Sequence, residues 1–195
     1  MISLPASTKI TITGDLGSGK SAVSRILCDR TGFTYVSTGR IQRQIAEEMG
    51  IDTLELNRLA DVDPSIDERI DGIFIQLGSD PGNFIVDSRM AWFFLPKSFK
   101  VYLKIDVHIA AARILSDANR SSEQYASIDD AVPKILARKK SENDRFLSKY
   151  SADCANFDNF DLVVDTASRT PDEVAGLILK GLEMRLAGEK FPHTL

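Results

Sequence analysis

Histidine and cysteine are scarce in this chain of 195 residues, and long hydrophobic runs are absent. The two histidines, His108 and His193, give poor support to a zinc site or a serine–histidine hydrolase. Cys28 and Cys154 form no CxxC pair and are typical of thiols in a reducing cytosol. Because no run of about 18 apolar residues and no signal-peptide pattern occur, we expect a cytoplasmic protein without a membrane partner.

The charge of the chain is also modest. Its net charge of −4 does not provide the basic footprint that nucleic-acid-binding proteins usually carry. A length of 195 residues fits one α/β domain, residues 1–195, with room for a mobile insertion. We therefore expect small-molecule partners and no nucleic acid. A monomer is the expected state, with a homodimer as the alternative.

One segment carries a complete phosphate-binding pattern, GxxxxGK[ST]. It reads GDLGSGKS, and its residues are the candidate cofactor-binding set: Gly14, Asp15, Leu16, Gly17, Ser18, Gly19, Lys20 and Ser21. A β-branched run over 9–13 precedes the segment, and apolar residues at helical spacing over 21–30 follow it. Strand, glycine loop and helix are the context that a phosphate-binding loop requires.

The chemistry of this loop follows from its residue types. Glycines permit backbone angles that let successive N–H groups converge on phosphate oxygens, next to the positive end of a helix. Lys20 is expected to reach the β and γ phosphates and to be catalytic, and the Ser21 hydroxyl is expected to bind Mg²⁺. The loop thus predicts a nucleoside triphosphate with Mg²⁺, and it does not specify what receives the phosphate. The alternative is a turn that merely joins a strand to a helix.

Strand-like and helix-like runs alternate along the chain, which predicts an α/β fold with a parallel sheet covered on both faces. The expected strands lie at 9–13, 33–37, 84–87, 100–105 and 161–165. Helices are expected at 21–30, 39–49, 52–60, from 63 with a buried stripe that runs to Leu77, 107–115, 128–150 and 170–186, and a turn is expected at 79–83. In the second helix, Ile41, Ile45 and Met49 are expected to face inward. A loop or helix break is expected over 116–127, and the tail 188–195 is expected to be loose.

Ligands of parallel sheets bind beyond the carboxyl ends of the strands, which directs attention to the residues after each strand. Phosphoryl transfer also favours arginine, whose planar fork grips phosphate. Arg43 and Arg89 follow strand ends, and Asp87 ends a strand as a carboxylate on the magnesium side does. Arg138 and Arg145 share one stripe of the long helix. The alternative for each arginine is a solvated surface position.

Four segments together resemble the cytidylate kinase family, most closely its compact form common in archaea. They read GDLGSGKS, YVSTGRIQRQIAEEMG, IVDSR and ARKKSENDRF, and the match runs from about residue 8 to 183. The family pattern Ser-x-Gly-x-Ile-x-Arg is matched from Ser37 to Arg43. The resemblance implies the three-layer P-loop fold of nucleoside monophosphate kinases. It has a five-stranded parallel core, a helical acceptor-binding region at about 38–80 and a lid at about 113–145.

The resemblance also implies an activity and a set of roles. The activity is transfer of the γ-phosphoryl group of ATP to CMP or dCMP. The implied substrate-binding residues are Ser37, Gly39, Arg43, Asp87 and Arg89. Arg138 and Arg145 match the lid arginines that close over the transferring phosphate and are expected to be catalytic, and the metal is expected at Ser21 and Asp87.

Two departures from the family pattern leave the acceptor open. Arg40 stands where compact members often have an acidic residue, and Ser88 replaces the glycine before Arg89. Lys139 and Lys140 also make the lid helix more basic than is common. A small-molecule kinase with another acceptor, such as another monophosphate or a coenzyme precursor, is therefore one alternative. A module that binds ATP without transferring it is the other.

Overall fold

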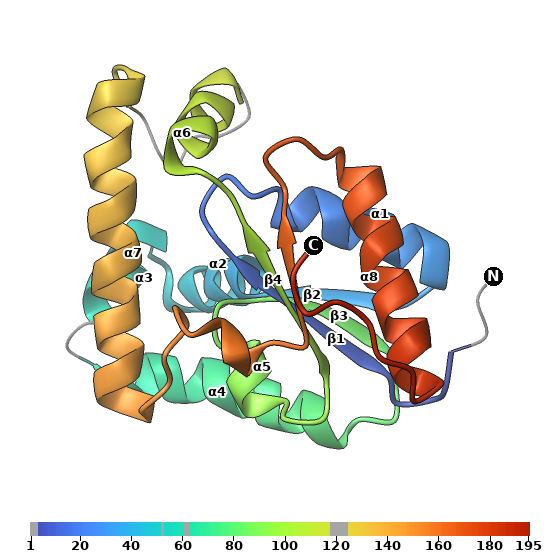
Figure 1. Cartoon of the computed structure of the whole chain (residues 1–195). Helices are drawn as coiled ribbons and strands as arrows, with labels where there is room; N and C mark the ends of the chain where they lie inside the picture. The colour runs from blue at the N-terminus through green and yellow to red at the C-terminus, as the bar shows by residue number, and fades with distance from the viewer. Residues whose placement is uncertain (1–3, 52, 61–62, 118–124) are drawn as a thin grey trace.

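The computed structural model describes residues 4–51, 53–60, 63–117 and 125–195. These residues form a five-stranded sheet in the order β2-β3-β1-β4-β5, with every neighbouring pair parallel (Figure 1). Helices cover both faces of the sheet. The predicted α/β class is therefore confirmed.

The bounds of the elements agree closely with the pattern of the sequence. The strands are β1 (Lys9–Gly14), β2 (Thr34–Ser37), β3 (Phe84–Asp87), β4 (Phe99–Lys104) and β5 (Leu162–Asp165). The helices are α1 (Lys20–Thr31), α2 (Thr38–Met49), α3 (Thr53–Ala60), α4 (Pro64–Ser79), α5 (Ala91–Phe94), α6 (Val107–Ser116), α7 (Ile128–Tyr150), the 3₁₀ turn η1 (Phe157–Asn159) and α8 (Pro171–Leu186). The short α5 and η1 were not predicted. Asp52, the first residue of the helix expected at 52–60, and most of the expected loop 116–127 lie outside the described residues.

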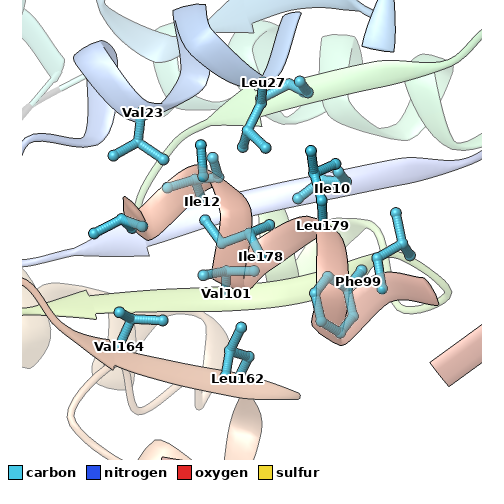
Figure 2. Close-up of a cluster of buried hydrophobic side chains, with 14 of the residues drawn as sticks. Ile10, Ile12, Val23, Leu27, Phe99, Val101, Leu162, Val164, Ile178 and Leu179 are labelled. Atoms are coloured by element: carbon cyan, nitrogen blue, oxygen red, sulfur yellow. The ribbon is translucent and has the colours of Figure 1, made fainter. Parts of the chain in front are cut away.

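One face of the sheet packs against α1 and α8, which lie side by side in Figure 1. Figure 2 shows the resulting cluster, in which Ile12 of β1, Val101 of β4 and Ile178 of α8 are almost fully buried. Residues two apart on a strand face the same side, so Ile10 joins Ile12 in this core. Fully burying an aliphatic side chain of this size contributes about 1.5–3 kcal/mol. This core fixes β1 and α1, the two elements that flank the glycine loop.

The opposite face is covered by α4, α5 and α7. Val86 of β3 belongs to a cluster with α2 and α4, and Tyr102 of β4 belongs to a cluster with Trp92 of α5. Thr13 of β1 is buried on this face, and its hydroxyl donates to the carbonyl of Ser88 at 3.0 Å. This hydrogen bond ties the segment after β3 to the strand that leads into the glycine loop.

Capping residues define where the helices of the second half begin. Thr170 and Glu173 form a reciprocal capping box at the start of α8. Ser127 caps α7 by accepting from Asp130 N, and Asp106 caps α6 by accepting from two backbone N–H groups. In the described part of the chain, no helix is both long enough and apolar enough to cross a bilayer.

Two local expectations were wrong. Met49, the last residue of α2, is 44% exposed, whereas Ile45, one turn earlier, is buried. The tail is not loose: it runs beside β5, where His193 O accepts from Val163 N at 2.7 Å and Leu195 N donates to Val163 O at 2.9 Å. Phe191 of the tail packs on Phe99, with ring centroids 5.9 Å apart.

Candidate active site

The glycine loop leaves the central strand β1 and enters α1. Gly14, Gly17 and Gly19 all have positive φ values, of 151°, 78° and 85°. A Cβ atom at Gly14 would lie 2.3 Å from Leu103 O, and one at Gly17 would lie 3.0 Å from atoms of Ala110. Both positions therefore need glycine because β4 and α6 approach the loop closely.

The start of α1 is arranged to accept an anion. Gly19 is the N-cap residue, so no side-chain oxygen of that residue competes for the first N–H groups of the helix. Lys20 Nζ donates to the carbonyl oxygens of Gly14 and Asp15 at 3.0 and 2.9 Å. The Ser18 hydroxyl donates to Asp15 O at 2.8 Å, which closes the loop on itself. The ammonium group of Lys20 thus lies over the backbone of the loop.

The two predicted metal residues are in contact. Ser21 Oγ donates to Asp87 Oδ2 at 3.0 Å, and Tyr35 OH donates to the same carboxylate oxygen at 3.0 Å. Burial, together with the charge of Asp87, raises the pKa of Tyr35. A hydroxyl and a carboxylate are hard oxygen donors of the kind that Mg²⁺ takes, so the residues present fit this ion. The described residues contain no cluster of three or more histidine, cysteine and acidic side chains that could hold a metal.

Asp15, inside the glycine loop, is a structural anchor. Its Oδ1 accepts from Tyr102 OH at 2.7 Å and from Lys139 Nζ at 2.6 Å, and its Oδ2 accepts from Ile105 N at 3.1 Å. The Asp15 side chain is only 12% exposed. Burial and the Asp15 carboxylate raise the pKa of Tyr102, which therefore remains a donor. The loop is thus held by β4 on one side and by α7 on the other.

Arg89 and Arg138, predicted from separate segments, are brought together by one carboxylate. Arg138 Nε donates to Glu142 Oε1 at 2.9 Å, and Arg89 forms an ion pair with the other oxygen of Glu142. Burial and the charge of Arg138 lower the pKa of Arg89. Arg145, about two turns beyond Arg138 on α7, lies with its guanidinium 5.3 Å from the centroid of the Phe146 ring.

A cavity of about 410 Å³ lies beside these groups. Its lining includes the first residues of the glycine loop, Tyr102, Arg89 and the stretch of α7 that carries Arg138 and Lys139. Arginines from two elements and a phosphate-loop segment therefore face the same space. Such a convergence of polar groups on one concave site is typical of a substrate site.

The other predicted substrate residues lie at the start of α2. Ser37 ends β2 beside Asp87 of β3, and its hydroxyl accepts from Arg40 N at 3.2 Å. A Cβ atom at Gly39 would lie 3.5 Å from Arg43 Nη1, and the Arg43 side chain is exposed. Among the residues described, Ser37, Gly39 and Arg43 are not part of the cavity lining. They are connected to the glycine loop through Asp87 instead of through the cavity. Asp87 is the register partner of Ser37 in the sheet, and its carboxylate accepts from Ser21 of the loop.

Sequence reasoning missed three side chains of this site. Tyr35 bonds Asp87, Tyr102 bonds Asp15, and Glu142 joins Arg89 to Arg138. Tyr35 lies in β2 and Tyr102 in β4, and no motif marks either residue. The position of Glu142 four residues after Arg138 is a detectable helical pairing signal, but its contact with Arg89 is not encoded locally.

The glycine loop between β1 and α1, on a parallel sheet with strand order 2-3-1-4-5, defines a P-loop kinase fold. A model of the cytidylate kinase-like family matches residues 9–168. The chain therefore belongs to the cytidylate kinase-like family, and it is a phosphotransferase of the nucleoside monophosphate kinase kind.

Individual relatives agree with this assignment. The chain is 38% identical over 173 residues to a cytidylate kinase of Sulfolobus acidocaldarius, covering 88% of this chain and 92% of the relative. It is 35% identical over 180 residues to a cytidylate kinase of Sulfurisphaera tokodaii, covering 91% and 97%. The structure of a shikimate kinase from Acinetobacter baumannii in complex with shikimate superposes with a TM-score of 0.61 at 17% identity, covering 91% and 94%. That similarity shows the fold alone.

Proposed function

We propose that this protein transfers the γ-phosphoryl group of ATP to CMP or dCMP. The observation that carries the proposal is the convergence of the first residues of the glycine loop, from Gly14 to Leu16, with Arg89 and Arg138 on one cavity. Phosphoryl transfer needs charge neutralisation and alignment more than covalent chemistry, and these groups supply both. The names of the relatives, cytidylate kinases, support the choice of acceptor.

In this proposal, the donor half of the site is the glycine loop. Its N–H groups and Lys20 bind the donor phosphates, and the oxygens of Ser21 and Asp87 hold Mg²⁺. Mg²⁺, when bound, neutralises charge on the donor phosphates. The hydrogen bond from Tyr35 keeps the Asp87 carboxylate turned toward Ser21.

The acceptor half lies in the region of about 38–80, which follows the edge strand β2. Arg43 grips the acceptor phosphate from the exposed side of α2, and Ser37 and Gly39 line the same subsite beside Asp87. The region of about 113–145, of which 118–124 lie outside the described residues, acts as a lid that excludes water. Its arginines Arg138 and Arg145 stabilise charge on the moving phosphoryl group. No general base is required, because the acceptor is already an anion.

A panel of acceptors separates this proposal from its rivals. ATP is supplied with CMP, dCMP, UMP, AMP and non-nucleotide acceptors, and ADP release is measured. The highest kcat/KM with CMP or dCMP supports the proposal. A preference for another acceptor would favour the alternative of a small-molecule kinase with a different acceptor, which the exposed Arg40 suggests. ATP binding without transfer to any acceptor would identify a non-catalytic module.

Two substitutions test the division of the site. Lys20→Ala should abolish transfer, because it removes the charge at the donor phosphates. Arg43→Ala should lower kcat/KM for the acceptor about 10- to 100-fold, the loss of one charged hydrogen-bonding group, while basal ATP hydrolysis persists. Arg25→Ala, which removes an exposed arginine from α1, serves as the control. Equal loss of hydrolysis and transfer in Arg43→Ala would refute the acceptor assignment.

A further inference from the structure

Glu142 contacts the same groups through which Arg89 and Arg138 are to bind phosphate. One of its oxygens accepts from Arg138 Nε at 2.9 Å, and the other pairs with Arg89. The Glu142 side chain is 22% exposed and that of Arg89 is 25% exposed, so both ions of this pair are largely shielded from water. The contact also joins α7 to the segment that follows β3.

The physical reason for this contact is repulsion between the two arginines. The charge of Arg138, in addition to burial, disfavours the charged form of Arg89. Two guanidinium groups that face one cavity require an anion between them, and a phosphate or a carboxylate can supply it. Glu142 supplies it from within the chain. A phosphate that binds the same N–H groups has to displace at least part of this carboxylate.

We propose that Glu142 is a positioning residue that holds Arg89 and Arg138 together and competes with substrate phosphate for them. The proposal rests on the phosphotransfer function only in that Arg89 and Arg138 are to contact phosphate. Its consequence is quantitative. A contact that occupies the arginines in nine molecules of ten weakens the apparent affinity for phosphate about tenfold.

The test is Glu142→Gln, which keeps the shape of the side chain and removes its charge. Binding of pyrophosphate, with no turnover, is measured by titration calorimetry at about 0.15 M salt, where long-range charge effects are screened. The variant should bind pyrophosphate about tenfold more tightly than the wild type, and its KM for the acceptor should fall while kcat does not rise. Asp129→Asn removes one negative charge from the first turn of the same helix, at an exposed position outside the cavity lining. It is the matched control, expected to change the affinity less than twofold.

Each outcome decides the matter. Unchanged affinity in Glu142→Gln with a lower Tm would show that Glu142 only supports the fold, and weaker binding would show that it assists the phosphate. An equal gain in both variants would attribute the effect to net charge. If Glu142→Gln fails to fold, Glu142→Asp, which is one methylene shorter, should tighten binding by a smaller factor, and unchanged affinity there overturns the proposal. A wild type that transfers phosphate to no acceptor would refute the proposed function while the calorimetric result still stood.

Discussion

Replacement of Asp15 by alanine should strongly destabilise the protein. The side chain accepts hydrogen bonds from Tyr102 OH and Ile105 N, and it pairs with Lys139. A hydrogen bond to a charged group contributes about 1.5–3 kcal/mol when it is shielded from water. The pair with Lys139 is worth about 0.5 kcal/mol, because the lysine is 46% exposed. The expected loss of unfolding free energy is therefore about 4 kcal/mol.

The loss can be measured by urea unfolding and by thermal denaturation. For a chain of this size, 1 kcal/mol corresponds to about 2–4 °C, so we expect Tm to fall by about 8–16 °C. Tyr102→Phe should lose about a third to a half of the free energy that Asp15→Ala loses. The double variant should be little less stable than Asp15→Ala, because the two residues share one hydrogen bond.

A different result would refute the reasoning at an identifiable step. If the unfolding free energy of Asp15→Ala lies within about 1 kcal/mol of the wild-type value, the carboxylate does not anchor the loop. If the losses of Asp15→Ala and Tyr102→Phe simply add, the two side chains act independently, and the 2.7 Å contact between them contributes nothing to stability. Lys139→Met should change Tm by less than about 2 °C, which tests the small free energy assigned to the exposed Asp15–Lys139 ion pair.

Two further predictions concern glycine and cysteine. Gly14→Ala should lower the unfolding free energy by about 3 kcal/mol in urea titrations, since its Cβ would lie 2.3 Å from Leu103 O. Gly72→Ala should raise the unfolding free energy by about 0.5–1 kcal/mol, because Gly72 lies inside α4 with open space around its Cβ position. Changes of the same sign in the two glycine variants would contradict these expectations. Burial, with the charge of Asp29, raises the pKa of Cys28 to about 11, so at pH 8 its thiolate fraction is roughly a hundredth of that of an ordinary cysteine. Iodoacetamide should therefore label native Cys28 about a hundredfold more slowly than denatured chain, as followed by mass spectrometry, and equal rates would contradict the shift.

Local patterns were sufficient to predict most of the fold. The helix α7 begins at Ile128 and ends at Tyr150, as predicted, because Ser127 caps it and Ser151 ends it in a left-handed conformation. The contact of Ser21 with Asp87 was also foreseeable, since parallel strands place their carboxyl ends at one edge.

The remainder of the site depended on packing between distant segments. The contact of Glu142 with Arg89 joins a long helix to the end of a buried strand, and no spacing in the sequence specifies which side chain of that helix faces the strand end. The helix α5 has only four residues, which is too short to show a period. The tail 188–195 was expected to be loose, whereas backbone pairing with Val163 of β5 determines its course.

The pairing of the tail with Val163 covers β5, one of the two edge strands of the sheet. Any foreign strand that docks on β5 would first have to displace the hydrogen bonds between Val163 and the segment from His193 to Leu195. Self-association through extension of the sheet is thereby disfavoured on this side. At the opposite edge of the sheet, β2 has four residues, from Thr34 to Ser37, and leads directly into α2.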